Sequence, residues 1–196
     1  GALKKIILDD FGLVESKKII VLHDGADYLD LENLKKIKLD KNDKKIKHIG
    51  YVGHLYKGRG INVIISLSLE NKNHYFHVIG GNETDIEYWK KKCQNTNIIF
   101  HGFIEPYLVP SYLYSFDILI APYQDKVLIS NGMDTSEWMS PLKLFEYMSV
   151  KKPILTSNIK VLKEIFVHKV NSYLCDPSDQ KEWEEGLKYL INNSKH

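Results

Sequence analysis

Residues 46–61 read IKHIGYVGHLYKGRGI, and this stretch shows the strand, loop and helix order that recurs along the chain. An apolar, strand-like run (46–53) leads into a glycine-rich loop, and a helical pattern begins at residue 61. Further strand-like runs stand at 75–81, 97–103, 117–123, 152–157 and 171–177. Helix-like stretches stand at 61–70, 84–94, 108–115, 141–149, 159–166 and 178–192. This alternation predicts an α/β fold, a Rossmann-like doubly wound parallel sheet with helices on both faces.

The loops after the strands are the expected location of a functional site. Right-handed crossover connections bring the C-terminal ends of all strands in such a sheet to one edge. Ligands of open α/β sheets bind at this edge. We therefore look for functional residues directly after each strand-like run.

The loop after the first strand contains Gly53, His54, Arg59 and Gly60. It matches neither common phosphate motif, because a P-loop needs Lys and then Ser or Thr where Arg59 and Gly60 stand, and the dinucleotide fingerprint needs glycine at Val63. Its glycines still allow a ligand close to the backbone, the helix start offers free N–H groups, and a guanidinium suits phosphate oxygens. The alternative is a glycine-rich turn with solvated basic side chains.

The next loops carry weaker signals. Gly80 and Gly81 form a second tight strand-to-helix turn. Phe103, followed by Ile104, either floors a pocket for a flat base or belongs to the core. His101 is interpreted as a hydrogen-bonded strand histidine. After the fourth strand comes a loop of about seventeen residues, a length that is uncommon in a compact domain unless the loop has a function.

The long loop ends at SPLKLFEYM, residues 140–148. We expect Ser140 to cap the following helix and Pro141 to occupy its first position. Lys143 then falls in the first turn, where the helix dipole disfavours a cation unless an anion binds there. Lys143 and Glu146 share a helix face, so a cation beside phosphate and a carboxylate beside ribose hydroxyls would suit a nucleotide. The alternative is an ordinary exposed ion pair.

Composition excludes several other classes of protein. Lys and Arg number 27 and Asp and Glu 25, a near balance that argues against nucleic acid as a partner. Two cysteines, Cys93 and Cys175, have no CxxC spacing, which favours a reducing, cytoplasmic setting. No apolar run approaches the roughly 18 residues of a membrane span. The histidines show no metal-ligand spacing, and no metal site is expected.

The N-terminal part of the chain differs from the rest. It contains one strand-like run, KIIVLHDG at 18–25, followed by a charged stretch without strong periodicity. We interpret residues 1–43 as the end of a preceding domain plus a linker, and residues 44–196 as the α/β domain.

Six segments in order resemble the retaining, GT-B-fold glycosyltransferases of family 4, often called group 1. They are HIGYVGHLYKGRGI, HVIGG, NIIFHGFI, ILIAPY, SPLKLFEYMSVKKPIL and NSYLCDP. The resemblance covers the C-terminal, donor-binding half of that family, roughly residues 44–192. It implies that 44–196 is the nucleotide-sugar-binding domain.

The resemblance also implies roles for single residues. Arg59 stands where the family has a lysine that binds the donor diphosphate, and His54 stands where many members have arginine. Glu146 matches the second glutamate of an E-x₇-E element, which typically bonds the ribose, whereas Trp138 stands in place of the first. Glu137 is one residue off that position.

Further positions complete the site that the resemblance implies. Phe103 and Ile104 fall where the family lines its base pocket, and Leu142 and Lys143 where backbone N–H groups meet the phosphates. The expected catalytic residues are Arg59, Lys143 and Glu146. The expected nucleotide-sugar-binding residues are Gly53, His54, Arg59, Gly60, Gly80, Gly81, Phe103, Ile104, Ser140, Leu142, Lys143 and Glu146.

The implied reaction is transfer of a sugar from a UDP- or GDP-linked donor to a glycan or lipid-linked acceptor, with retention and without a cofactor or metal. The N-terminal domain would bind most of the acceptor, so we expect this chain alone to bind nucleotide and catalyse little. Polysaccharide biosynthesis, with peripheral association at the inner membrane face, is the setting implied. Alternatives are a GT-B sugar-nucleotide epimerase and a non-catalytic Rossmann-like binding module.

Overall fold

The computed structural model describes residues 1–11, 16–39, 43, 45–94, 96–129 and 131–193. Its centre is a six-stranded, all-parallel sheet with the strand order β3-β2-β1-β4-β5-β6. The strands are β1 (His48–Val52), β2 (Tyr75–Ile79), β3 (Ile98–Gly102), β4 (Ile118–Ala121), β5 (Ile154–Ser157) and β6 (Tyr173–Cys175). Each of the six expected strands from residue 46 onward is present. This is the strand order of doubly wound dinucleotide-binding folds, and the predicted fold class is confirmed.

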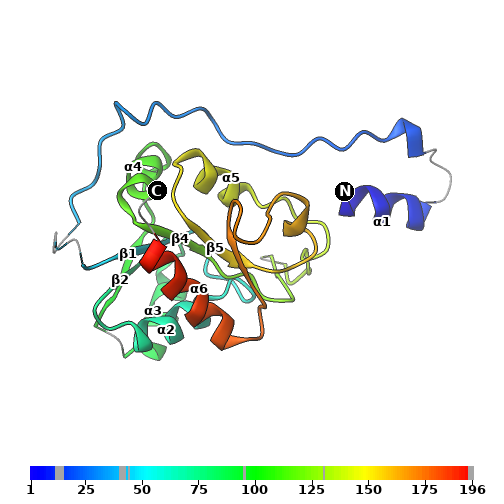
Figure 1. Cartoon of the computed structure of the whole chain (residues 1–196). Helices are drawn as coiled ribbons and strands as arrows, with labels where there is room; N and C mark the ends of the chain where they lie inside the picture. The colour runs from blue at the N-terminus through cyan, green and yellow to red at the C-terminus, as the bar shows by residue number, and fades with distance from the viewer. Residues whose placement is uncertain (12–15, 40–42, 44, 95, 130, 194–196) are drawn as a thin grey trace.

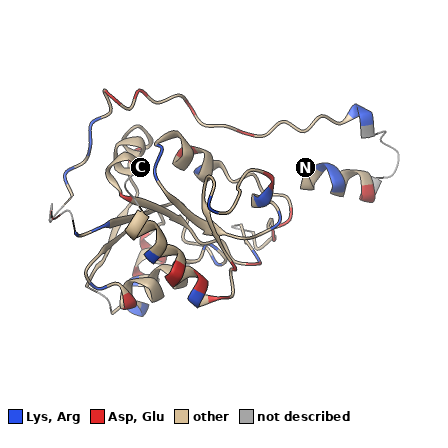
Figure 2. Cartoon of the chain, viewed as in Figure 1, with Lys and Arg blue, Asp and Glu red and all other residues tan. Residues whose placement is uncertain are grey.

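Helices cover both faces of the sheet (Figure 1). The α-helices are α1 (Ala2–Phe11), α2 (Ile61–Glu70), α3 (Glu83–Lys92), α4 (Val109–Ser115), α5 (Leu142–Ser149) and α6 (Gln180–Asn193). Short 3₁₀ helices occur at η1 (Ser16–Lys18), η2 (Pro106–Leu108) and η3 (Leu162–Glu164). Helices α4 and α5 lie on one face, whereas α2, α3 and α6 lie on the other. Figure 2 shows that charged residues are frequent in α6, whereas α4 has none.

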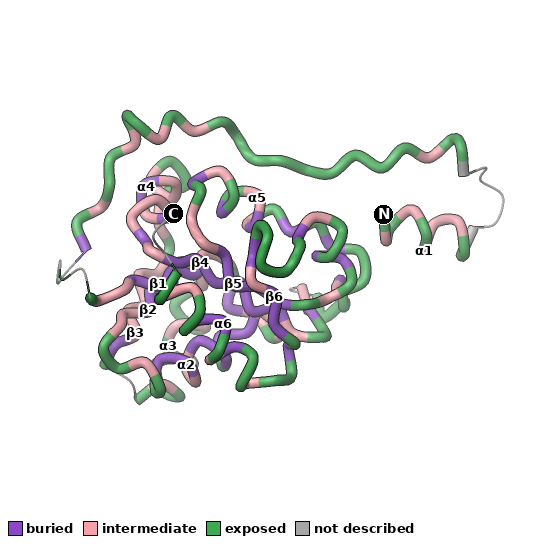
Figure 3. The backbone as a smooth tube through the Cα atoms, in the orientation of Figure 1, coloured by how far each residue is buried: buried purple, intermediate pink, exposed green. Residues whose placement is uncertain are grey.

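Strand β4 shows why the core has two halves. Its residues alternate between them: Leu119 and Ala121 join the cluster under α4 and α5, and Ile118 and Ile120 join the cluster under α2 and α6. All four side chains are fully buried, which explains why the strand reads as a continuous apolar run. Figure 3 shows the buried strands between the two helical layers.

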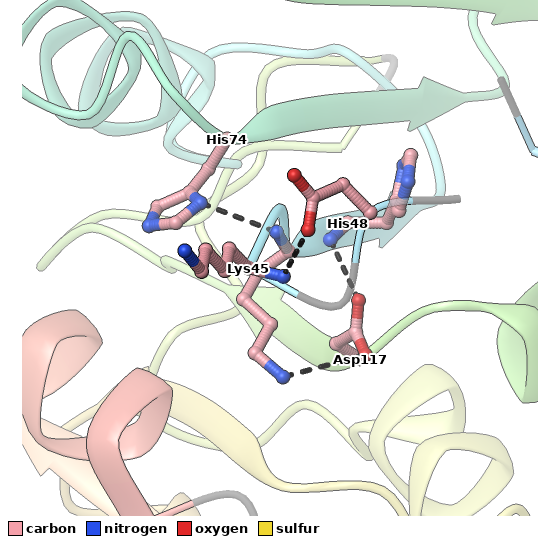
Figure 4. A network of polar contacts seen from close by, with 6 residues as sticks. Lys45, His48, His74 and Asp117 are labelled. Atoms are coloured by element: carbon pink, nitrogen blue, oxygen red, sulfur yellow. Dashed lines mark hydrogen bonds and ion pairs between the residues drawn. The ribbon is translucent and has the colours of Figure 1, made fainter. Parts of the chain in front are cut away.

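A polar network holds together the edge where the strands begin (Figure 4). The Asp117 carboxylate accepts a hydrogen bond from the backbone N–H of His48 at 2.8 Å, and its other oxygen lies 3.9 Å from the Nζ atom of Lys47. The backbone N–H of Lys47 donates to Nδ1 of His74 at 3.2 Å. These bonds tie the starts of β1, β2 and β4, so the opposite edge is the one with open loops.

The strand expected at residues 18–25 is absent, and that prediction is wrong. After η1 the chain runs without regular secondary structure, and Ile20 and Leu22 are 78% and 87% exposed. A strand needs a hydrogen-bonded neighbour, and the six-stranded sheet includes no strand from this segment. Only further along do Leu31 and Ile37 pack against the core, where Leu39 is buried. The expected domain boundary at residues 43–44 falls partly outside the described residues.

The helix expected at residues 159–166 shrinks to the single 3₁₀ turn η3. Leu162 and Phe166 are both buried, and the backbone N–H of Phe166 donates to the carbonyl of Leu162 at 2.8 Å. Leu162 and Phe166 can both pack into the core from a single turn, so packing does not require a longer helix. An eight-residue helix would also have little stability of its own. Within the part of the chain that the structure describes, no helix is long and apolar enough to cross a membrane.

Candidate functional site

The expected site residues gather where the strand order reverses, between β1 and β4. The loop after β1 leads to α2, and the loop after β4 runs from Pro122 to α5. From Pro122 to Pro141, residue 130 aside, this loop has no helix or strand; one isolated bridge joins Leu128 to Asp134. Ligands of doubly wound sheets bind in the crevice at this reversal.

Lys143, in the first turn of α5, lies partly buried over two tyrosine rings. Its Nζ atom donates to the hydroxyl of Tyr51 at 3.1 Å and stands 4.2 Å from the centre of that ring. The centre of the Tyr123 ring is 5.2 Å from the same Nζ atom. Gly53 lies directly beneath, because a Cβ atom added there would come within 2.5 Å of Nζ. Glycine at position 53 therefore leaves the room that the lysine needs.

Arg59 approaches the same place from the loop after β1. Its guanidinium carbon stands 5.6 Å from the centre of the Tyr123 ring. Its Nε atom is buried and has no hydrogen-bond partner in the described structure. Arg59 and Lys143, which we call the cation pair, thus converge on one tyrosine.

The cation pair has no carboxylate partner within 4.0 Å among the described residues. Burial lowers the pKa of Lys143 well below its usual value, and the charge of Arg59 lowers it further, while Glu146 opposes the shift. Burial also raises the pKa of Tyr123 to about 12, which keeps its hydroxyl neutral. Two like charges in partly dry surroundings are costly, and a bound anion would relieve that cost.

Glu146 lies one turn further along α5 and borders a cavity of about 510 Å³. Leu142, Pro106, Pro110 and the segment 25–29 form other parts of its wall. Burial raises the pKa of the Glu146 carboxyl, and the charge of Lys143 opposes that shift. No ion pair within 4.0 Å joins Glu146 to Lys143, both of which are described, so the exposed ion pair considered above is absent. Leu142, which precedes Lys143 on α5, and Glu146 both line the cavity, and its volume falls in the range of small-molecule sites, roughly 300–1,000 Å³.

The other glycines of the site approach neighbouring protein atoms. Gly60 has φ +78°, and a Cβ atom there would lie 1.8 Å from the carbonyl oxygen of Pro122. A Cβ atom on Gly80 would lie 2.4 Å from the carbonyl oxygen of Gly53, and one on Gly81 would meet the Leu55 side chain at 2.5 Å. These glycines lock the loops after β1, β2 and β4 together.

Phe103 and Ile104, the residues expected to line a base pocket, lie apart from the 510 Å³ cavity. Phe103 is 71% exposed, so its interpretation as core is wrong, and Ile104 packs against the core cluster of α4 and α5. Neither lines the cavity. His54 is exposed at the start of the β1 loop, and its ring stacks on Tyr56 with centres 4.8 Å apart. Burial, Arg59 and Lys143 all lower the pKa of His54.

With this geometry established, comparisons identify the family. The model of the family "Glycosyl transferases group 1" matches residues 32–196. The chain belongs to this family.

Solved structures agree with this group 1 fold. A mutant of S. aureus TarM, in complex with Fondaparinux, alpha-GlcNAc-glycerol and UDP, is 16% identical with a TM-score of 0.70 over 98% of this chain and 36% of its own. HepE of Anabaena, in complex with UDP, is 16% identical with a TM-score of 0.62 over 77% of this chain and 40% of its own. The C-terminal domain of LpcC from Francisella tularensis, a glycosyl transferase group 1 family protein, is 22% identical with a TM-score of 0.61 over 85% and 89%. None of the curated proteins compared with this sequence matches it.

The start of α5 in this group 1 domain differs from expectation. The helix begins at Leu142, with Pro141 as its N-cap residue, and the exposed Ser140 side chain makes no capping bond. The backbone N–H of Leu142 donates to the carbonyl of Ser140 at 3.0 Å, so it is not open to a ligand. The next N–H group, that of Lys143, has no acceptor among the described residues. Pro141 has ψ +61°, outside the helical range, and this moves the first position by one residue.

Sequence reasoning missed three tyrosines that support the group 1 site. Tyr51 and Tyr123 form the surface under the cation pair. Tyr147, buried in α5, accepts a hydrogen bond from the backbone N–H of Val52 at 2.8 Å and so fixes the helix to the end of β1. Tyr51 stands near the end of a buried strand, and a polar aromatic side chain at such a position was the available signal for this tyrosine.

Proposed function

We propose that this chain is the donor-binding half of a retaining, family 4 glycosyltransferase with a GT-B fold. It binds a nucleotide-activated sugar, which the full-length protein uses to glycosylate a glycan or lipid-linked acceptor. The observation that carries the proposal is the cation pair, two partly buried positive charges at the switch point of a group 1 domain. Among the described residues no carboxylate lies within 4.0 Å of either cation. TarM and HepE, whose structures contain UDP, support a nucleoside diphosphate as the ligand.

The cation pair would act on the diphosphate. Negative charge develops on the leaving diphosphate as the sugar departs, and preorganised cations stabilise such charge without reorganisation. Arg59 offers a planar donor fork, and Lys143 adds its ammonium group and an open backbone N–H at the start of α5. We expect no metal ion to be needed for this step.

The cavity beside Glu146 would hold the nucleoside. The Glu146 carboxylate lies one helical turn from Lys143, so a ribose bound to Glu146 could carry its diphosphate to the cation pair. Val109, Leu113 and the two prolines give the cavity an apolar side suited to a base. Trp138 replaces the first glutamate of E-x₇-E, so we expect the transferred sugar to be bound in a way particular to this protein.

Calorimetric titration with UDP, GDP and ADP tests the proposal. We expect one diphosphate to bind selectively, with affinity falling at least about tenfold in Arg59→Ala, since a charged hydrogen bond contributes roughly 1.5–3 kcal/mol. Glu146→Ala should weaken the contact with the nucleoside, and therefore the binding of the monophosphate (UMP or GMP) as well as that of the diphosphate. The exposed Lys57→Ala, in the same loop, is the matched control. Equal affinity of Arg59→Ala and Lys57→Ala for the diphosphate would refute the proposed site.

A further inference from the structure

A second and larger cavity, of about 1240 Å³, lies on the other side of the glycine loop. It is bounded by that loop, the start of α2, helix α3, the loop after β4 and residues 177–178 after β6. Residues that line it include Tyr56, Asn62, Tyr88, Trp89 and Gln124. Its size exceeds the roughly 300–1,000 Å³ of ordinary small-molecule sites, so it has room for an extended ligand. Of the residues expected above to bind the nucleotide sugar, only Gly60 lines it.

Aromatic rings form one wall of this cavity, and they are held in place. The indole N–H of Trp89 donates to the carbonyl of Leu55 at 3.2 Å. The ring of Tyr88 packs edge-on against Trp89, with centres 5.2 Å apart and planes at 82°. Lys92 covers Tyr88 from the other side at 4.4 Å and donates to its hydroxyl at 2.5 Å. Tyr88 nevertheless stays 50% exposed, so a fixed aromatic surface faces a potential ligand.

Amide side chains from two loops complete the lining. Asn82 accepts a hydrogen bond from the backbone N–H of Asp85 at 2.8 Å, which fixes it at the start of α3. Gln124 is fixed twice, by its backbone N–H to the carbonyl of Gly58 at 2.9 Å and by its side chain to the carbonyl of Pro122 at 3.0 Å. Amides offer both donors and acceptors, as hydroxyl groups require.

The charges of the cavity balance. Lys57 and Lys126 line it together with Asp85 and Asp125. A diphosphate would favour a wall with excess positive charge, as at the cation pair, and a cationic ligand would favour the opposite. A neutral ligand with hydroxyl groups and apolar ring faces fits both the balance of charge and the aromatic wall.

We propose that this cavity binds sugar units of the acceptor glycan. The inference rests on the proposed function, because an acceptor sugar must reach the donor's anomeric carbon beside the diphosphate. Gly58 and Gly60 line the cavity on the loop that carries Arg59, so a sugar bound there lies next to the cation pair. The C-terminal half of the enzyme then contributes to acceptor choice as well as to donor binding.

Chemical-shift mapping of the ¹⁵N-labelled chain tests the proposal. The probes are the methyl glycosides of glucose, galactose, mannose and N-acetylglucosamine at millimolar concentration. We expect at least one to shift the indole N–H signal of Trp89 together with backbone signals of Tyr56, Asn62 and Tyr88. Tyr88→Ala should weaken that glycoside roughly fivefold or more. Tyr107 is 77% exposed and lies outside the cavity, so Tyr107→Ala should leave glycoside binding unchanged.

Titration of UDP, GDP and ADP in the same samples separates the two proposals. Glycoside binding that persists in Arg59→Ala, while binding of the preferred diphosphate is lost, supports both. Glycoside binding without binding of any of the three diphosphates supports the cavity and refutes the donor site. If none of the four glycosides shifts the cavity signals, or if Tyr88→Ala and Tyr107→Ala bind them equally, the cavity proposal is refuted whatever UDP does.

Discussion

The pH dependence of stability should depend on a buried histidine chain that spans β1, β2 and β3. Nδ1 of His48 lies 2.8 Å from Nε2 of His77, and Nδ1 of His77 lies 2.9 Å from Nε2 of His101. His77 is 2% exposed, and burial, followed by its two histidine neighbours, lowers its pKa from 6.5 to about 3. The folded protein therefore resists protonation at a site that the unfolded chain protonates readily.

The sign and size follow from linkage. Between pH 6.5 and about 3 the unfolded state binds a proton at His77 that the folded state does not, so stability falls as the pH falls through this window. pH 5 lies about 1.5 units below the unfolded pKa of 6.5. At 1.36 kcal/mol per unit, the folded state is therefore less stable at pH 5 by about 2 kcal/mol. Above pH 6.5 the contribution is constant.

Urea unfolding followed by circular dichroism at pH 7.5 and pH 5.0 measures this difference. His77→Gln keeps a donor and an acceptor at the site but cannot titrate. We expect the wild type to lose about 2 kcal/mol more than His77→Gln between the two pH values. His23→Gln, at an exposed position of the N-terminal segment, is the control and should behave as the wild type. If His77→Gln loses as much stability as the wild type, the histidine chain is not the cause and the reasoning is wrong.

Three further predictions concern the site. Gly60→Ala should lower the free energy of unfolding by about 2 kcal/mol or more, measured by urea titration, because of its positive φ and the contact with Pro122. Tyr147→Phe should cost roughly 1–3 kcal/mol in the same assay, because the backbone N–H of Val52 loses its partner; an unchanged midpoint would contradict this. UDP binding at pH 9 should take up protons, because a bound anion raises the lowered pKa of Lys143. Calorimetry in buffers of different ionisation enthalpy detects this uptake, and Lys143→Met should abolish it.

Much of the fold could be predicted from the sequence because its signals are local. Parallel strands buried on both faces read as apolar runs, and the alternation with helices fixes the class. Residues 61–70 were predicted as helix and form α2 with the same bounds. The two failures, 18–25 and 159–166, are segments whose structure depends on distant partners. A strand needs a neighbouring strand for its hydrogen bonds, and the conformation of the short stretch around Leu162 depends on how that side chain packs into the core.

The site could be predicted as a location but not as a geometry. Topology brings Arg59 and Lys143 to one edge from positions 84 residues apart, and the sequence indicates that edge. It does not indicate that both cations share the ring of Tyr123, because cation–ring contacts between loops have no local pattern. For the same reason Gly60 was interpreted as room for a ligand, whereas it makes room for the carbonyl of Pro122 in the loop after β4.

The helix start at α5 shows how these levels combine. A lysine in the first turn is disfavoured by the helix dipole, and burial over Tyr51 adds a desolvation cost. The fold offsets part of this cost by cation–ring contacts and by the glycine that gives Lys143 its space. The charge repulsion from Arg59 is not offset by any described carboxylate within 4.0 Å. A site that concentrates positive charge at a helix N-terminus is less stable empty than filled, so an anion that binds there should stabilise the folded chain.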